Sequence, residues 1–206
     1  MAQDVIAIIC DCDGTLCPDT TNQLVSGLGI DTHEFWNQDV DALVSDGWDH
    51  TLAYLSKLLD LTRDRLIDPL TRSKMEEVGK NVEFYPGALD FVGRLQERLS
   101  ASSEYQEAGI SIEWYILSSG IEDILRASRL GGISTDIFGC AFEYEPTGRA
   151  TTVKRSVTFT EKTKFAHAIS KGISGDELRR RPYRVNDAMK EEDKRVPFRN
   201  MVYIGD

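Results

Sequence analysis

Two aspartates after a short apolar run are the residues best suited to chemistry in this 206-residue chain. Asp11 and Asp13 end the run IAIIC with one residue between them, and a glycine and a threonine follow. Two carboxylates this close resist joint ionisation unless a cation compensates their charge. Mg²⁺ takes oxygen ligands and leaves room in its shell for a phosphate. The pair therefore predicts a magnesium site, with one aspartate as nucleophile and the other as general acid and base.

Polar residues that follow two other apolar runs are candidates to complete this site. Ser118 and Ser119 follow the run WYIL, and Asp206 follows MVYIG. Ser118 could hydrogen-bond a phosphoryl oxygen or cap the next helix, a position that serine favours. Ser119 is the second candidate, and the adjoining Gly120 is counted with these serines as phosphate-binding. Asp206 could add a third carboxylate to the metal site.

A cation is needed to neutralise the charge that develops during phosphoryl transfer, and two lysines are candidates for this role. Lys162 and Lys164 open a predicted helix, TEKTKFAHAISKG, with Thr160 as its N-cap and Gly172 as its stop. Lys162 is favoured because it precedes the inward-facing Phe165 by nearly one helical turn. Lys164 remains the alternative.

These residues need a scaffold that brings the ends of distant strands together. Short apolar runs at 5–10, 114–117 and 201–204 predict strands that are buried on both faces, as in a parallel sheet. Helical patterns lie between them, and further strands with a turn at 146–148 are predicted. This alternation predicts an α/β fold, in which ligands bind beyond the carboxyl ends of the strands.

The region 18–83 is predicted to be a helical insert. HEFWNQDVDALV and DHTLAYLSKLL carry apolar residues at helical spacing, and FYPGALDFVGRL then begins the pattern of the core again. The charged stretch 174–200 is predicted to be rich in loops. We therefore expect a discontinuous core of residues 1–17 and 84–206, interrupted by a helical domain at 18–83.

Four motifs, taken in order, resemble those of the haloacid dehalogenase superfamily of phosphatases. DCDGTL (11–16) resembles the first motif and YILSSG (115–120) the second, while TEKTKF (160–165) resembles the lysine motif and MVYIGD (201–206) the start of the acidic fourth motif. The resemblance spans the whole chain, and its first motif is the most specific. The nearest subgroup is similar to phosphoserine phosphatase. The resemblance implies a Rossmann-like core of parallel strands with an inserted α-helical cap.

The resemblance also implies a function, that of a Mg²⁺-dependent phosphatase of a small phosphorylated metabolite. Asp11 would be the nucleophile that forms an aspartyl-phosphate, and it would bind the metal. Asp13 would be the general acid and base, with its backbone carbonyl on the metal. Ser118 would hold the phosphoryl group, Lys162 would stabilise its charge, and Asp206 would be a further metal ligand. The second aspartate of the motif argues against a true dehalogenase, which lacks it.

The sequence departs from the family pattern in two places. The fourth motif normally continues past GD with a second acidic residue, whereas this chain stops at Asp206. Phosphoserine phosphatases carry a glutamate soon after the first motif, but only Asp19 lies there, so phosphoserine is not the expected substrate. Three alternatives stay open: an inactive or truncated binding module, a phosphotransferase or phosphomutase, and a protein phosphatase that docks through its helical insert.

Composition narrows the kinds of partner that we expect. The formal net charge is −10, which disfavours nucleic acid, since an acidic surface repels its phosphates. No apolar run reaches the length of a membrane span, and the first residues lack the basic start of a signal peptide. The cysteines lack paired zinc spacing and indicate a reducing compartment. We therefore expect a cytoplasmic protein with no membrane partner.

Overall fold

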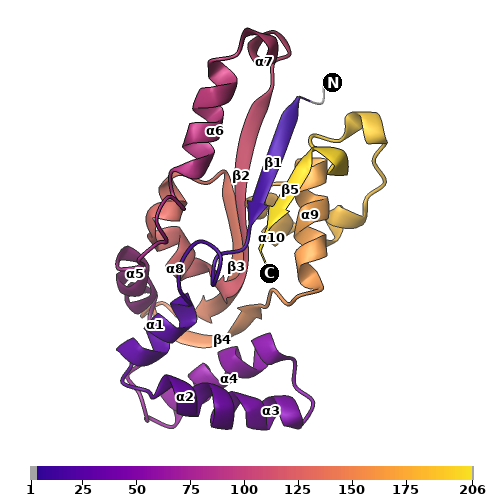
Figure 1. Ribbon diagram of the computed structural model, residues 1–206. Helices are drawn as coiled ribbons and strands as arrows, with labels where there is room; N and C mark the ends of the chain where they lie inside the picture. The colour runs from indigo at the N-terminus through magenta and orange to yellow at the C-terminus, as the bar shows by residue number, and fades with distance from the viewer. Residues whose placement is uncertain (1–3, 206) are drawn as a thin grey trace.

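A five-stranded sheet forms the centre of the computed structural model, which describes residues 4–205 (Figure 1). The strand order is β4-β3-β2-β1-β5. Neighbouring strands are parallel except for β4, which runs antiparallel to β3. The bounds are β1 Val5–Cys10, β2 Ser111–Ile121, β3 Asp136–Tyr144, β4 Ala150–Arg155 and β5 Met201–Ile204. The predicted α/β fold with its parallel sheet is confirmed.

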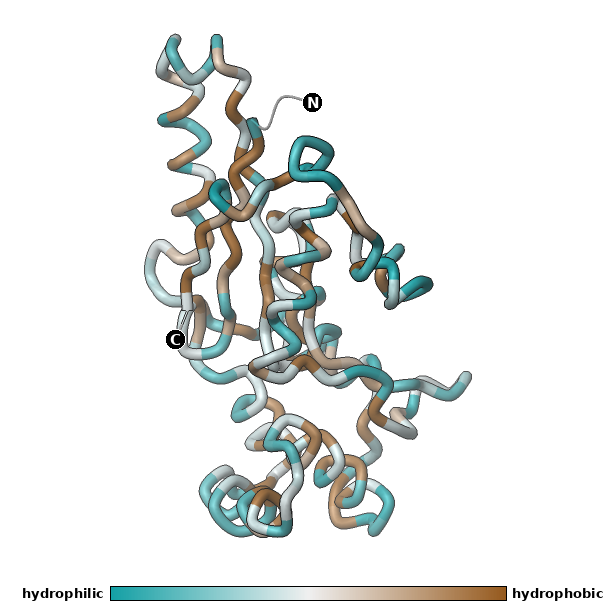
Figure 2. The backbone as a smooth tube through the Cα atoms, turned by 90° about the vertical axis from the view of Figure 1, so that its right-hand side faces the viewer, coloured by the Kyte–Doolittle hydropathy of each residue, from teal (hydrophilic) through white to brown (hydrophobic). Residues whose placement is uncertain are grey.

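Strand β1 is buried, as its apolar sequence predicts. Ala7, Ile8, Ile9 and Cys10 are at most 4% exposed, and the strand lies between β2 and β5 within the sheet. Hydrophobic residues run along the central strands of the molecule (Figure 2). The apolar run at 114–117 predicted a strand that is too short, since β2 continues through the polar residues up to Ile121.

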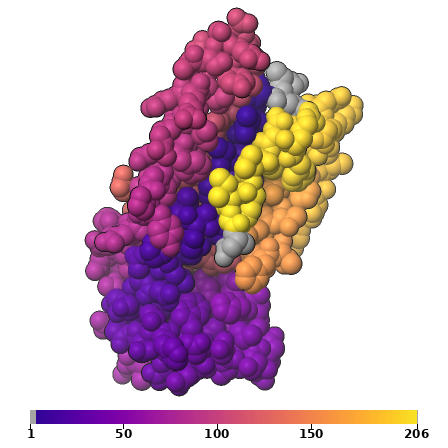
Figure 3. Space-filling model, in the orientation of Figure 1, coloured from indigo at the N-terminus to yellow at the C-terminus, as the bar shows by residue number. Residues whose placement is uncertain are grey.

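Five α-helices and one π-helical turn connect β1 to residue 80. They are α1 Thr20–Gly27, α2 Thr32–Glu34, the π-helical turn Phe35–Val40, α3 Asp41–Ser45, α4 His50–Arg63 and α5 Arg72–Lys80. Polar side chains start four of these α-helices by accepting a backbone N–H bond, and these caps are Asp19, Asp31, Asp49 and Thr71. The helices from α1 to α4 lie beyond the carboxyl end of β1 and form the lower lobe in Figure 3.

The remaining helices pack beside the sheet. They are α6 Phe91–Ser100, α7 Ser103–Glu107, α8 Glu122–Ala127, α9 Glu161–Lys171 and α10 Gly175–Arg180. Gly172 ends α9 with a φ of 70°, as predicted, whereas the side chain of Thr160 makes no cap hydrogen bond. The stretch 174–200 was predicted to be rich in loops, but it contains α10 and short 3₁₀ turns.

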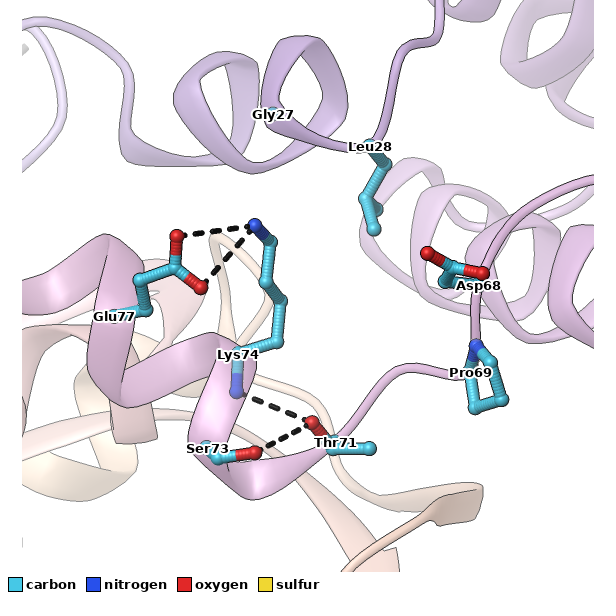
Figure 4. A pocket seen from close by; sticks show the side chains of 8 residues that line it. All are labelled: Gly27, Leu28, Asp68, Pro69, Thr71, Ser73, Lys74 and Glu77. Atoms are coloured by element: carbon cyan, nitrogen blue, oxygen red, sulfur yellow. Dashed lines mark hydrogen bonds and ion pairs between the residues drawn. The ribbon is translucent and has the colours of Figure 1, made fainter.

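One cavity lies between α1 and α5, and none of the predicted site residues lines it (Figure 4). In the close-up, the Nζ atom of Lys74 points at the carboxylate of Glu77, and the hydroxyl of Thr71 accepts the backbone N–H of Lys74. These contacts are a helix cap and an exposed ion pair, which stabilise α5 locally.

Among residues 4–205, no helix combines the length and apolar character that a membrane crossing needs.

Candidate active site

The loop after β1 holds its two aspartates in fixed orientations. The backbone N–H of Asp11 donates to the carbonyl of Ile204, which ties the end of β1 to the end of β5. The carbonyl of Cys12 then accepts the N–H groups of Thr15, Leu16 and Cys17, so the chain closes into a tight turn. Gly14 has a φ of 75° within this turn, a conformation that glycine adopts without strain. The glycine of the DCDGT motif therefore shapes the loop.

Asp11 is buried and already faces a cation. Its residue is 7% exposed, its Oδ1 accepts the N–H of Cys12 at 2.7 Å, and its Oδ2 forms an ion pair with the Nζ atom of Lys162. Lys162 also donates to the hydroxyl of Tyr203 at 3.2 Å. Burial lowers the pKa of Lys162, but the hydrogen bond and charge of Asp11 outweigh it and raise the pKa above its ordinary value. This lysine therefore stays charged beside Asp11.

Lys164, the alternative lysine, lies elsewhere. Its Nζ atom pairs with Glu161 one turn earlier on α9 and lies 5.0 Å from the ring centre of Phe165. The structure thus brings Lys162, and not Lys164, to Asp11. The reason is helical spacing, since residues two apart on a helix point in directions about 200° apart.

Asp13 is half-buried and lies opposite a serine. Its Oδ1 accepts the backbone N–H of Thr20 at 2.7 Å, and the hydroxyl of Ser118 donates to its Oδ2 at 3.4 Å. Burial raises the pKa of Asp13 to about 6, although the hydrogen bond from Thr20 opposes this rise. A carboxyl group with this pKa exchanges its proton near neutral pH, as a general acid and base must.

The segment after Leu117 contributes two serines and a glycine, and the two serine hydroxyls differ in their hydrogen bonding. Ser118 is fully buried, and its Oγ accepts the N–H of Gly120 at 2.9 Å. The Oγ of Ser119 is buried and has no hydrogen-bond partner, and the same holds for the Oγ1 of Thr20. Buried hydroxyls without partners are rare in proteins, so these two are polar groups that the protein itself leaves unsatisfied.

Gly120 keeps open a space into which three oxygen atoms point. A Cβ atom at this position would lie 2.6 Å from the Oδ2 of Asp13, 3.2 Å from the Oγ of Ser118 and 3.4 Å from the Oγ1 of Thr20. These are hard oxygen atoms, the kind of ligand that Mg²⁺ prefers, and they can also accept hydrogen bonds from waters bound to the metal. The residues present therefore fit a magnesium ion and a phosphate near Asp11 and Asp13.

This space gives a first prediction, on stability. We expect Gly120→Ala to lower the free energy of unfolding by about 1–2 kcal/mol, since the added methyl group displaces the carboxylate of Asp13 from its bonds. Urea denaturation at constant pH measures the change. Gly93→Ala is the matched control, because Gly93 lies in α6 with no atom within 4 Å of the added methyl group. That control gains roughly 0.5–1 kcal/mol, and an equal gain in Gly120→Ala would contradict the crowded site.

Two buried cysteines adjoin Asp13. The Sγ atoms of Cys12 and Cys17 are 3.5 Å apart, and both thiols are free. With a carboxylate oxygen of Asp13 they form a group whose atoms lie within 4.8 Å of one another. The hydrogen bond from Cys17 and burial raise the pKa of the Cys12 thiol well above its ordinary value. Mg²⁺ prefers hard oxygen ligands to sulfur, so the carboxylate oxygens are the better donors for this metal.

Asp206, the third predicted carboxylate, lies outside the described residues. Its neighbour Gly205 approaches Asp11 closely, since a Cβ atom on Gly205 would lie 2.8 Å from the Cβ of Asp11.

Asp19 caps α1 by accepting the N–H of Asn22 at 2.9 Å. The structure therefore gives Asp19 a local structural role.

Similarity searches place this geometry among known folds. No family model matches the sequence. An uncharacterized protein of Borreliella burgdorferi is 22% identical over 226 residues, which cover 99% of this chain and 75% of that protein. A HAD family hydrolase of Salmonella enterica serovar Typhi superposes with a TM-score of 0.56 at 13% identity, over 84% of this chain and 54% of its own. This chain therefore spans about half the length of that hydrolase.

Two structures of phosphoserine phosphatase give the same result. One, with an analogue of its phospho-aspartyl intermediate, has a TM-score of 0.54 at 15% identity over 84% of this chain and 76% of its own. The other, in the apo form, has a TM-score of 0.54 at 14% identity over 98% of this chain and 77% of its own. The chain has the haloacid dehalogenase fold. The predicted family resemblance is thereby confirmed at the level of the fold.

Some contacts around the candidate site could not be predicted from the sequence. Tyr54 on α4 is buried, and its hydroxyl donates to the carbonyl of Ser119 at 2.7 Å across 65 residues of chain. The indole of Trp36 donates to Asn22 at 2.5 Å and stacks on His50 with ring centres 5.6 Å apart. Tyr54 reads as one more apolar residue of a helix in the sequence. Only the folded chain shows that its hydroxyl meets the loop after β2.

Proposed function

We propose that the chain is a Mg²⁺-dependent phosphatase that hydrolyses a small phosphorylated metabolite through an aspartyl-phosphate at Asp11. The observation that carries the proposal is the buried Asp11 carboxylate, paired with Lys162 and one residue from Asp13. The fold, which is shared with phosphoserine phosphatases, supports this reaction class. Asp11, the backbone carbonyl of Asp13 and Asp206 would hold the metal, which when bound offsets the negative charge of carboxylates and phosphate.

The reaction proceeds in two displacements. A carboxylate oxygen of Asp11 attacks phosphorus, the bond from phosphorus to the ester oxygen breaks, and Asp13 gives its proton to the departing alcohol. A water molecule then attacks the phosphorus of the aspartyl-phosphate while Asp13 takes its proton, and inorganic phosphate leaves. The hydroxyl of Ser118 and the ammonium of Lys162 bind phosphoryl oxygens during both steps. Ser119 and Gly120 complete the phosphate pocket.

We infer that residues 18–83 form a helical cap over a core made of 1–17 and 84–206. Helices α1 to α4 lie beyond the carboxyl end of β1, where ligands bind in such sheets (Figure 1). The two ends of the insert meet, since the N–H of Tyr85 donates to the carbonyl of Leu16 at 2.9 Å. The hydrogen bond from Tyr54 to Ser119 then joins the cap to the phosphate pocket. A cap in this place excludes water and selects the substrate.

Removing the metal tests the proposal. Phosphate release from p-nitrophenyl phosphate and from a panel of phosphorylated metabolites is measured with Mg²⁺ and with EDTA. We expect release with Mg²⁺ and a loss of about 100-fold or more in EDTA, because the carboxylate pair then repels the phosphate. Re-addition of Mg²⁺ controls for damage by the chelator. Release that is unchanged by EDTA, or absent from every substrate, would contradict the proposal.

A further inference from the structure

A second cavity, separate from the Asp11 site, is lined by unusual side chains. Its volume is about 680 Å³, within the range of small-molecule sites. Its walls come from α5, α8, β3, β4, α9 and α10, which surround the end of β3 (Figure 1). Lys164 of α9 lines this cavity, whereas Lys162 faces Asp11. The two sites therefore lie on different sides of α9.

One wall of the cavity is aromatic. Phe138, Phe142 and Phe165 line it and are at most 3% exposed, with the rings of Phe138 and Phe165 4.9 Å apart. Tyr144 lies at the opening, where the guanidinium of Arg72 covers its ring at 4.4 Å. The three phenylalanine rings lie too deep to offer a face, so Tyr144, which is half-buried, is the aromatic ring of the lining that a flat apolar group can reach.

The base of the cavity is a rigid group of guanidiniums around one buried carboxylate. Glu122 is 6% exposed and accepts from the Nε of Arg126 at 2.6 Å, from the Nη1 of Arg179 at 3.0 Å and from Arg155. Two further carboxylates, Asp136 and Asp176, pair with the outer nitrogens of this group. The arginines are therefore already ordered, and little conformational entropy is lost when they meet a ligand.

The rim of the cavity carries cations whose carboxylate partners do not line it. Lys154 pairs with Glu143 and Lys164 with Glu161, and both carboxylates are more than a third exposed. Such exposed pairs contribute little energy, so a phosphate can displace them. Arg180 has no carboxylate partner within the described part of the chain, and its Nε donates to a backbone carbonyl at 3.3 Å.

The side chains that line the cavity carry more positive than negative charge. Seven basic and two acidic side chains line the cavity, in a chain whose net charge is −10. A concentration of positive charge in a concave, partly apolar site attracts anions despite the charge of the whole protein. We propose that this cavity binds a phosphate joined to a planar ring, the chemistry of a nucleoside phosphate. Its ring packs beside Tyr144, and its phosphate lies against Lys154 and Arg180.

Titration calorimetry of the whole chain with AMP tests this proposal. The titrations contain EDTA, so that the carboxylates at Asp11 and Asp13 repel phosphate and the second cavity, which needs no metal, still binds. We expect one AMP per chain, with a dissociation constant below about 1 mM. Adenosine and inorganic phosphate are expected to bind at least about tenfold more weakly, because each fills half of the site. AMP that binds no more tightly than phosphate would overturn the proposal.

Paired variants locate the binding. The double variant Lys154→Gln with Arg180→Gln is expected to weaken AMP binding at least about tenfold, since both side chains are exposed rim groups. Lys80→Gln with Arg98→Gln removes the same charge outside the cavity and is expected to bind AMP like the unmodified chain. Lys162→Ala, at the Asp11 site, is expected to keep AMP binding. Loss of binding in either of these two controls, or none in the rim variant, would overturn the assignment. This outcome is independent of the phosphatase proposal.

Discussion

Asp11→Asn is expected to lower the rate of phosphate release with Mg²⁺ by about 10³-fold or more, because an amide oxygen is a poor nucleophile and cannot form the aspartyl-phosphate. The substitution also removes the charge that Lys162 faces in the buried pair. Steady-state phosphate release from the best substrate of the panel measures the effect. The remaining rate then reports catalysis by the rest of the site alone.

The control for this prediction is the same substitution at a neighbouring carboxylate. Asp19→Asn keeps an N-cap for α1, because asparagine accepts the same backbone bond as aspartate. We expect this variant to release phosphate within about threefold of the unmodified chain. A rate in Asp11→Asn above about a tenth of the original would exclude Asp11 as the nucleophile, provided that the two variants unfold at the same urea concentration.

Lys162→Ala is expected to lower the turnover number by about 10²–10³-fold, the size of effect seen when a preorganised donor to a developing charge is removed. The side chain of Lys162 is 14% exposed, so water replaces its ammonium poorly. The turnover number and KM, determined separately at several pH values, distinguish this effect from a change in substrate binding.

Lys164→Ala is the matched control for Lys162, since both lysines lie in the first turn of α9. Its Nζ atom pairs with Glu161 at the surface, so we expect the rate to change by less than about threefold. Equal losses in the two variants would show that the first turn of α9, and not the ammonium beside Asp11, determines the rate.

The strands could be predicted from the sequence because their signals are local. The apolar run 5–10 and the motif DCDGT follow one another in the chain, so both β1 and the turn with Gly14 are readable from a few residues. The role of Lys162 beside Asp11 came from the family resemblance, and helical spacing relative to Phe165 gave the preference for Lys162 over Lys164. Phe165 is buried, at 2% exposure, as that preference requires.

Other parts of the structure depend on long-range contacts and left no local signal. The three arginines around Glu122 come from α8, β4 and α10, and the helix α10 lies in a stretch whose charge indicated loops. High charge favoured solvent exposure in the prediction, but ion pairs with a buried glutamate hold these side chains in place. Tyr54 is a similar case, because its partner is a backbone carbonyl, which any residue can supply.

The π-helical turn Phe35–Val40 lets the helical region after β1 change its length by one residue. A π turn takes in one residue more than an α turn, so deleting one residue here lets the helix continue in α form. The helices α2 and α3 on the two sides then keep nearly the same relative orientation, because the tighter α turn compensates for the lost residue. Trp36, which lies within the turn, bonds Asn22 and stacks on His50, would shift relative to these partners. A change of one residue at this turn would therefore alter the surroundings of Trp36 without repacking the helices on either side.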